Sequence, residues 1–325
     1  MTVNRSISGK TVLVTGGAGF IGSHLVDSLL REGAEHVAVI DNMFVGSESN
    51  LADALATGKI TLYRDDAEFA NSLQYIAGRH AIDIVFNCAT KALNYSFINP
   101  ANAFGTNVTV ALNLLELQRA GAFKTLCHFS TSEVYGTAVY EPMDEQHPRN
   151  PTTTYAAGKA AADIAVESYV HMFDVDAFIV RPFNNYGPRQ NYLGLLAGII
   201  PITAWRILNG EQPELHGEGT QTRDFIMVHD TIDAVVKLFH VLPAGQSVNI
   251  SSDNQTSMSD LVDRIADHLN YTGQILRKPA RQADVLCHNA SNQKVKGLID
   301  YSLTPFNAGL AQTLEWYVRK IGDNQ

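Results

Sequence analysis

The feature that most constrains the fold is a glycine-rich turn near the amino terminus, between an apolar run and a helical pattern. The stretch "TVLVTGGAGFIGSHL" places Gly16, Gly19 and Gly22 at intervals of three residues. The first glycine permits a tight turn, the second lets the backbone approach a pyrophosphate, and the third allows close packing of helix and strand. The helix that follows offers free N–H groups and the positive end of its dipole to an anion. The turn therefore predicts a dinucleotide-binding site, with Phe20 and Ile21 among its contacts.

An acidic residue at the end of the next predicted strand indicates which dinucleotide is bound. Asp41 ends the run "HVAVID", and no Arg or Lys occurs in the "NMFVGSESN" that follows. A carboxylate at this place can accept hydrogen bonds from the hydroxyls of the adenosine ribose, and it would repel a 2′-phosphate. We therefore expect NAD rather than NADP as the cofactor, with Asp41 and Asn42 as contacts.

Short apolar runs alternate with longer helical patterns in the first half of the chain. The predicted strands are 11–15, 36–41, 60–63, 83–89, 125–130 and 176–182. This alternation favours a parallel, doubly wound sheet, the Rossmann type of α/β fold. After about residue 185 the pattern becomes irregular, and later helices such as "SMSDLVDRIADHLN" have Ser and Asp start signals. We predict an NAD-binding Rossmann domain over 1–184 and a smaller substrate-binding lobe over 185–325, with segments that can interleave.

The composition disfavours several classes of function. The chain of 325 residues has a formal net charge of -9, which disfavours general nucleic-acid binding, although one basic pocket can still bind phosphates. Its three cysteines are widely spaced and form no CxxC, so we expect neither a disulfide framework nor a metal site. The amino terminus lacks the apolar core of a signal peptide, and no apolar run is long enough to span a bilayer. We expect a cytoplasmic protein that does not bind membranes.

The stretch "YAAGK" pairs Tyr155 with Lys159, four residues apart on one face of a predicted helix. On its own, such a pair is more commonly an exposed helix face. Behind a dinucleotide fingerprint and the stretch "FSTSEVYG", it indicates catalysis. A lysine beside a phenol favours the phenolate, so we expect the pKa of Tyr155 to be lowered and the tyrosine to act as a general base.

Six stretches together resemble the extended short-chain dehydrogenase/reductase superfamily, in its nucleotide-sugar epimerase/dehydratase branch. They are "TGGAGFIG", "ATKALNYSFINP", "STSEVYG", "YAAGK", "RPFNNYGPRQ" and "HGEGTQTRDF". The resemblance extends over nearly the whole chain. It implies an enzyme that binds NAD and a nucleotide-diphosphate sugar, and that begins by oxidising carbon 4 of the sugar.

The resemblance implies a role for each matching residue. Thr131 matches the hydroxyl that hydrogen-bonds the 4-oxygen of the sugar, Tyr155 would take the proton of the 4-hydroxyl, and Lys159 would hold the nicotinamide ribose. Asp65 falls where the family contacts adenine, and Lys91 falls where UDP-galactose 4-epimerases place a lysine near the cofactor phosphates. Ala89 completes the expected cofactor contacts. The expected substrate contacts are Ser132, Asn184, Arg189, Arg223 and Arg281.

Glu133 and Ser132 bear on which reaction follows the oxidation. A simple 4-epimerase needs no further base, whereas Glu133 resembles the base that removes the carbon-5 proton in 4,6-dehydratases and the glutamate of UDP-glucuronate decarboxylases. Dehydratases of the dTDP-glucose type carry Asp at position 132, so the serine argues against that subtype. The stretches "ATKALNYSFINP" and "TRDF" look more like epimerases and some amino-sugar dehydratases. We favour a lyase outcome, either dehydration or decarboxylation, over 4-epimerisation.

A protein of another class stays open as an alternative. Some members of this superfamily keep the dinucleotide fold and act as NAD-dependent binding or regulatory proteins, and these usually lack the Tyr or the Lys. Because Thr131, Tyr155 and Lys159 are all present, we expect an enzyme.

Two predicted helices, near 99–120 and 153–172, suggest an oligomer. Related enzymes pair two such helices per subunit into a four-helix bundle, so we expect a homodimer. The apolar residues that we expect on these helices beyond the needs of one core face are Val108, Leu112, Leu115, Ile164 and Val166.

Overall fold

The chain folds around a parallel sheet of seven strands. The computed structural model describes residues 3–280 and 285–322, and Arg281 lies outside this range. The spatial order of the sheet is β11-β6-β5-β4-β1-β2-β3, with every neighbouring pair parallel. Its strands are β1 (Thr11–Thr15), β2 (His36–Ile40), β3 (Ile60–Tyr63), β4 (Ile84–Asn87), β5 (Thr125–Phe129), β6 (Asp176–Pro182) and β11 (Ser247–Ile250). This order is that of the Rossmann fold and confirms the predicted α/β class.

The six strands predicted from the sequence are all present, and each boundary agrees within a few residues. The seventh, β11, was not predicted. It comes from the second half of the chain and pairs with β6, where Val248 lies opposite Val180. Segments on both sides of residue 185 therefore build the central sheet.

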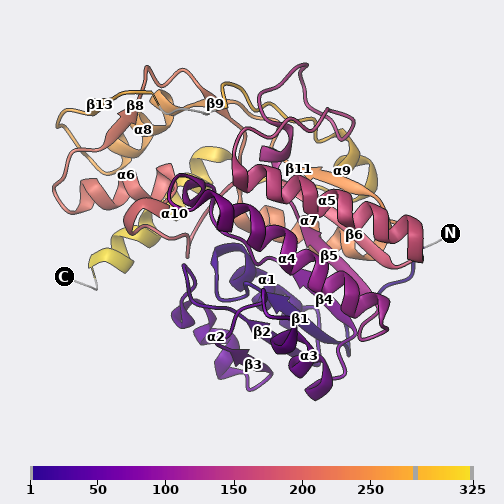
Figure 1. Ribbon diagram of the computed structural model, residues 1–325. Helices are drawn as coiled ribbons and strands as arrows, with labels where there is room; N and C mark the ends of the chain where they lie inside the picture. Colours follow the sequence, from indigo (N-terminus) through magenta and orange to yellow (C-terminus); the bar gives the residue numbers. More distant parts are fainter. Residues whose placement is uncertain (1–2, 281–284, 323–325) are drawn as a thin grey trace.

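Successive residues of each strand point to opposite faces of the sheet, and both faces are covered by helices. Val12 and Val14 of β1 pack in one core with α1, α2, α7 and α9, while Leu13 packs in a second core with α3, α4 and α5. Figure 1 shows α4 and α5 side by side along their face of the sheet. The covering helices are α1 (Phe20–Arg31), α2 (Ala52–Ala56), α3 (Ala70–Arg79), α4 (Pro100–Arg119), α5 (Thr154–Phe173), α7 (Val228–Val241) and α9 (Gln293–Leu298).

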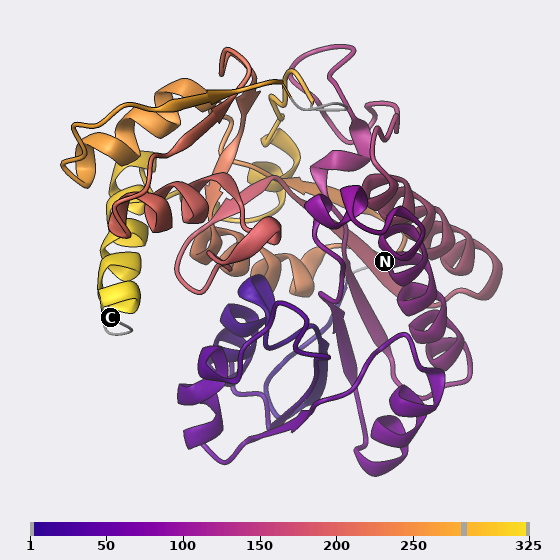
Figure 2. The same ribbon diagram turned by 60° about the vertical axis from the view of Figure 1, so that its left-hand side comes forward.

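A smaller lobe with its own apolar core stands beside the sheet, as Figure 2 shows. Its helices are α6 (Ile199–Leu208), α8 (Met258–His268) and α10 (Phe306–Gly322). The start of α8 confirms the predicted cap, since the Ser257 hydroxyl accepts a hydrogen bond from the Asp260 N–H at 3.2 Å. Short strands pair in and near this lobe as β10 with β7, β12 with β9 and β13 with β8. They are β7 (Asn184–Tyr186), β8 (Glu214–His216), β9 (Thr222–Arg223), β10 (Phe225–Met227), β12 (Thr256–Ser257) and β13 (Leu276–Lys278).

Helices α4 and α5 keep apolar side chains on the surface after the core is built. Leu112 is 37% exposed and Ile164 is 51% exposed, and Phe104 is exposed on the same helix pair. Two residues that we expected on this surface are instead core residues, since Leu115 and Val166 are fully buried against the sheet. Helical spacing alone did not separate the sheet-facing side from the outward side, because both sides of these helices are apolar.

Among residues 3–280 and 285–322, no helix is long and apolar enough to cross a membrane. Within the same ranges, no group of three or more His, Cys, Asp or Glu side chains is arranged to hold a metal ion.

Candidate active site

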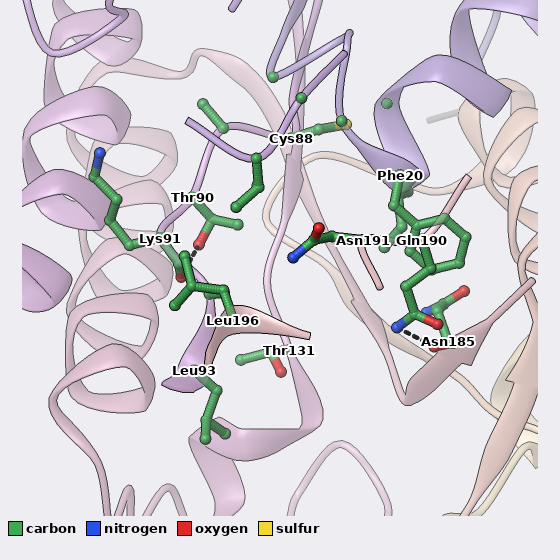
Figure 3. Close-up of a pocket in the computed structure, with 18 of the residues that line it drawn as sticks. Phe20, Cys88, Thr90, Lys91, Leu93, Thr131, Asn185, Gln190, Asn191 and Leu196 are labelled. Carbon is green, nitrogen blue, oxygen red and sulfur yellow. Dashed lines mark hydrogen bonds between the residues drawn. The ribbon is translucent and has the colours of Figure 1, made fainter. Parts of the chain in front are cut away.

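Two adjoining cavities open at the edge of the sheet where the strands end. We call the first the cofactor cavity; it measures about 440 Å³ and is lined by the loops that follow β1, β2, β4 and β5. Figure 3 shows Thr131 and Cys88 from the sheet side, with Gln190 and Asn191 approaching from the chain after β7. Ligands of open α/β sheets bind at this edge, near the point where the strand order reverses. Here that point lies between β1 and β4.

The glycine turn lies against this cavity, and its geometry requires glycine. Gly16 has φ +67°, and a Cβ there would lie 2.8 Å from the backbone nitrogen of Ala89. A Cβ on Gly22 would lie 2.2 Å from the Gly16 carbonyl oxygen. Gly19 precedes α1 and makes no side-chain cap, so the first N–H groups of the helix are left for an anion. The turn therefore fits the pyrophosphate of a dinucleotide, and Phe20 and Ile21 also line the cavity.

Asp41 lies at the end of β2 with its carboxyl group on the cavity wall. Its two oxygens accept hydrogen bonds from the N–H groups of Ala18 and Met43, each at 2.9 Å, and these bonds fix its orientation. Burial raises the pKa of Asp41, and the backbone hydrogen bonds oppose that rise. Each carboxylate oxygen keeps a second lone pair, so the group can still accept from ribose hydroxyls.

Four other expected cofactor contacts lie along the same cavity, but the ammonium group of one of them, Lys91, points away from its centre. Asn42, Asp65, Ala89 and Lys91 all line it. The Lys91 ammonium lies 4.3 Å from the centre of the Phe44 ring, and in Figure 3 it points away from Thr131 and Asn191. The cation–π contact therefore fixes the direction of the buried Lys91 side chain.

Tyr155 and Thr131 meet on the cavity wall from different elements. Thr131 follows β5 and caps the short turn Ser132–Tyr135, and Tyr155 lies in the first turn of α5. Burial raises the pKa of Tyr155 to about 12, and hydrogen bonds with the side chains of Thr131 and Thr90 oppose this rise. The predicted lowering of the Tyr155 pKa is thus wrong for the protein alone.

The reason is the place of Lys159. Its side chain is almost fully buried, and its Nζ donates a hydrogen bond to the Phe129 carbonyl oxygen at 2.8 Å. Burial lowers the pKa of Lys159 to about 8, while the nearby Asp163 carboxylate opposes that shift. Lys159 lies behind the cavity wall and is not a lining residue. Its charge therefore does not dominate the pKa of Tyr155, where desolvation is the largest influence.

A buried polar network lies near this lysine, and no sequence motif predicted it. The Arg181 Nε donates to Asp163 at 2.9 Å, and Arg181 also donates to the Tyr135 hydroxyl at 3.0 Å. Tyr135 in turn donates to Asn249 of β11 at 2.8 Å. Burial raises the pKa of Asp163, and Arg181 opposes that rise. Strand β11, which was not predicted from the sequence, is thus linked to α5, the helix that carries Tyr155 and Lys159.

Glu133 lies at the junction of the two cavities. The second cavity, of about 670 Å³, extends from Glu133 and Asn184 toward Trp205 and Arg206 of the smaller lobe. The Glu133 N–H donates to the Thr131 hydroxyl at 3.2 Å, so both residues are fixed by one turn. Glu133 is only 8% exposed and lines both cavities.

Some of the expected substrate residues line the two cavities, and one does not. Ser132 lines the cofactor cavity, Asn184 lines both cavities, and Arg223 lines the second. Arg189 lines neither cavity; it pairs with Asp27 of α1 at 2.7 Å. Sequence reasoning missed Arg206 of α6, a second arginine on the wall of the second cavity, which pairs with Glu214 at 3.2 Å.

The fold and this site define a dinucleotide-binding α/β protein with a Thr–Tyr–Lys constellation beside the cofactor cavity. A family model described as the NAD dependent epimerase/dehydratase family matches residues 12–251. The chain belongs to that family, and its cofactor is NAD.

Proteins with different activities resemble the chain to a similar degree. It is 30% identical to a UDP-glucose 4-epimerase of Mycolicibacterium smegmatis, with 95% of this chain and 98% of the relative covered. It is 29% identical to UDP-glucuronic acid decarboxylase 1 of Xenopus tropicalis, with 96% and 73% covered. The crystal structure of a dTDP-glucose 4,6-dehydratase from Streptomyces venezuelae, with NAD and TDP bound, superimposes with a TM-score of 0.90, 28% identity and coverage of 96% and 98%. Overall similarity therefore does not select one reaction.

Proposed function

We propose that the protein is an NAD-dependent lyase that acts on a nucleotide-diphosphate sugar. The reaction begins with oxidation at carbon 4 and continues with 4,6-dehydration, or with decarboxylation where the substrate is a uronate. The observation that carries this proposal is Glu133, a buried acid at the junction of the cofactor cavity and the second cavity. A 4-epimerase needs no such second acid beside its tyrosine.

The residues of the first step are Tyr155 and Thr131. The glycine turn and Asp41 would hold NAD, which would supply a hydride acceptor for carbon 4 and a positively charged nicotinamide ring that favours a nearby phenolate. Tyr155 takes the proton of the 4-hydroxyl group, and Thr131 orients that oxygen. Burial of the tyrosine keeps its proton in place when that positive charge is absent, since its pKa is then about 12.

The second step uses the acidity that the 4-ketone gives to carbon 5. Glu133 takes the carbon-5 proton, the electron pair left behind forms the double bond between carbons 5 and 6, and the 6-hydroxyl group leaves as water after it receives that proton from Glu133. Asn184, Arg206 and Arg223 line the second cavity, where the guanidinium groups suit the diphosphate of a nucleotide sugar. The nucleotide sugars named for related proteins agree with such a substrate.

The first experiment is to incubate the enzyme with a panel of UDP-, dTDP-, GDP- and CDP-sugars and to measure the masses of the products by mass spectrometry. Loss of the mass of water identifies dehydration, and loss of the mass of carbon dioxide identifies decarboxylation. An unchanged mass with a new sugar identifies epimerisation and contradicts the proposal. If no sugar is turned over while NAD still binds, the result contradicts the proposal and favours a non-catalytic, NAD-binding regulatory protein.

The second experiment separates Tyr155 from Glu133 with the substrate so identified. Tyr155→Phe should lose about 10²–10⁴-fold in the oxidation step while NAD binding stays close to that of the wild type. Glu133→Gln should still oxidise carbon 4 and accumulate enzyme-bound reduced nicotinamide, seen by its near-ultraviolet absorbance. Glu35→Gln is the matched control, since Glu35 is exposed beside the amino end of β2, at the opposite edge of the sheet. Wild-type turnover by Glu133→Gln would exclude a catalytic role for this residue and favour the epimerase.

A further inference from the structure

A histidine from the last third of the chain lies beside Glu133. His288 is fully buried, and its Nε2 lies 3.0 Å from the Gly136 carbonyl oxygen. A carbonyl oxygen can only accept, so Nε2 carries the hydrogen of that bond. Gly136 ends the turn that holds Glu133. The histidine is therefore held by the same turn that presents the acid.

The other ring nitrogen of His288 points toward the Glu133 carboxyl group. In a neutral imidazole whose Nε2 is protonated, Nδ1 is a hydrogen-bond acceptor. Nδ1 lies 3.8 Å from Glu133 Oε1 and has no hydrogen-bond partner, although it is buried. A buried acceptor without a partner is costly, and it requires an explanation.

The surroundings keep this ring neutral. Burial lowers the pKa of His288 to about 3, and the Arg223 cation and the nearby His147 lower it further, against the bond to Gly136. A neutral Nδ1 lone pair and a carboxylate oxygen repel each other. They attract only when a proton lies between them. The Nδ1–Oε1 distance must then shorten by about 1 Å to form a hydrogen bond.

We propose that His288 is a positioning residue that accepts a hydrogen bond from Glu133 when Glu133 holds the proton of carbon 5. The inference rests on the proposed function, in its dehydration form. In that step the bond from carbon 5 to its hydrogen breaks, and the proton binds to a Glu133 oxygen. The electron pair forms the double bond between carbon 5 and carbon 6 as the bond from carbon 6 to its oxygen breaks. Nδ1 of His288 receives the new O–H group of Glu133, which stabilises the protonated acid without taking its proton, and Glu133 then gives that proton to the departing oxygen, which leaves as water.

Two substitutions separate the two bonds of the ring. His288→Gln keeps a donor near the place of Nε2 and so retains the contact with Gly136, but it removes the acceptor that faces Glu133. His288→Asn keeps an acceptor near the place of Nδ1 and loses the contact with Gly136. His147→Gln is the matched control, because His147 is another buried histidine, whose ring nitrogens bond to Val139 and Pro148.

The assay is a single turnover in heavy water with the sugar identified by the panel. The near-ultraviolet absorbance of reduced nicotinamide reports carbon-4 oxidation, and mass spectrometry reports deuterium at carbon 5. We expect His288→Gln to slow the carbon-5 step by about 2- to 13-fold, the range of one hydrogen bond between neutral groups, with oxidation unchanged. His288→Asn should be faster than His288→Gln at carbon 5, and His147→Gln should match the wild type in both steps.

Three results would overturn the inference. The first is a carbon-5 rate in His288→Gln equal to that of the wild type, with Glu133→Gln still blocked; the lyase function would then stand without His288. The second is an equal slowing of both steps, which indicates general disruption of the fold. The third is loss of carbon dioxide in the sugar panel, which leaves a lyase but removes the carbon-5 abstraction. Epimerisation in that panel would refute the proposed function itself.

Discussion

Replacing Gly22 by alanine tests whether the turn before α1 holds the cofactor. The added Cβ would lie 2.2 Å from the Gly16 carbonyl oxygen, 2.8 Å from the Gly17 Cα and 2.9 Å from the Gly16 carbonyl carbon. All three are backbone atoms, so no side chain can rotate away. Because ordinary contacts are about 3.5 Å, the helix and the turn must separate by about 1 Å.

The size of the effect follows from this displacement. Overpacking of this kind costs about 1–3 kcal/mol of folding stability, which lowers Tm by about 1.5–4.5 °C in a protein of this size. Moving the turn also misplaces the N–H groups at the start of α1. Loss of two hydrogen bonds to a charged pyrophosphate, at about 1.5–3 kcal/mol each, weakens NAD binding by about 10²–10⁴-fold.

The measurements are differential scanning fluorimetry for Tm and calorimetry for the Kd of NAD. Gly78→Ala is the control, because Gly78 lies in α3 with no heavy atom within 4 Å of an added Cβ. This control should raise stability by up to about 1 kcal/mol and leave the Kd unchanged. An unchanged Kd for NAD in Gly22→Ala, whatever its Tm, would show that the turn does not carry the pyrophosphate.

Three further predictions follow from the structure. Calorimetry should show NAD bound at least about 100-fold more tightly than NADP, since a second phosphate near Asp41 costs about 3 kcal/mol at an effective dielectric constant of about 20; equal affinities would contradict this. Light scattering at micromolar concentration should show a homodimer, and Ile164→Glu on the exposed face of α5 should give monomers; a monomeric wild type would refute the prediction. Arg181→Met should cost about 3–5 kcal/mol at neutral pH, because it leaves the Asp163 carboxylate buried without its partner. Loss of Arg181 raises the folded-state pKa of Asp163 further above the unfolded value, so the deficit measured by urea unfolding should shrink as the pH falls and Asp163 is protonated; a deficit independent of pH would contradict this assignment.

A strand of the sheet could be predicted from the sequence where it is a continuous apolar run whose burial needs no partner from a distant part of the chain. The runs that form β1, β2 and β4 are almost continuously apolar, as buried parallel strands require. Strand β11 has the sequence "SVNI", in which Ser247 and Asn249 interrupt the apolar pattern. Asn249 can lie inside because it pairs with Tyr135, a contact between residues far apart in the chain. No local pattern reveals such a partner.

The site likewise has features that short motifs predict and features that arise only from the fold. Thr131, Glu133 and Tyr155 stand in short motifs, and the structure brings them together at one cavity wall. The pKa of Tyr155 could not be predicted from the spacing of Tyr155 and Lys159, because it depends on burial by distant elements. His288 carries no motif at all. Its position beside Glu133 arises only from the fold.

The late strand β11 also bears on how the chain is made. During synthesis, β6 emerges long before β11, so the edge of β6 has no neighbour until residue 250 has left the ribosome. An unpaired strand edge is a template for pairing with other chains, and the nascent protein is therefore open to misassembly throughout that interval. A chain truncated at residue 184 would keep this edge permanently. Chaperone dependence should accordingly be greatest for intermediates that stop between β6 and β11.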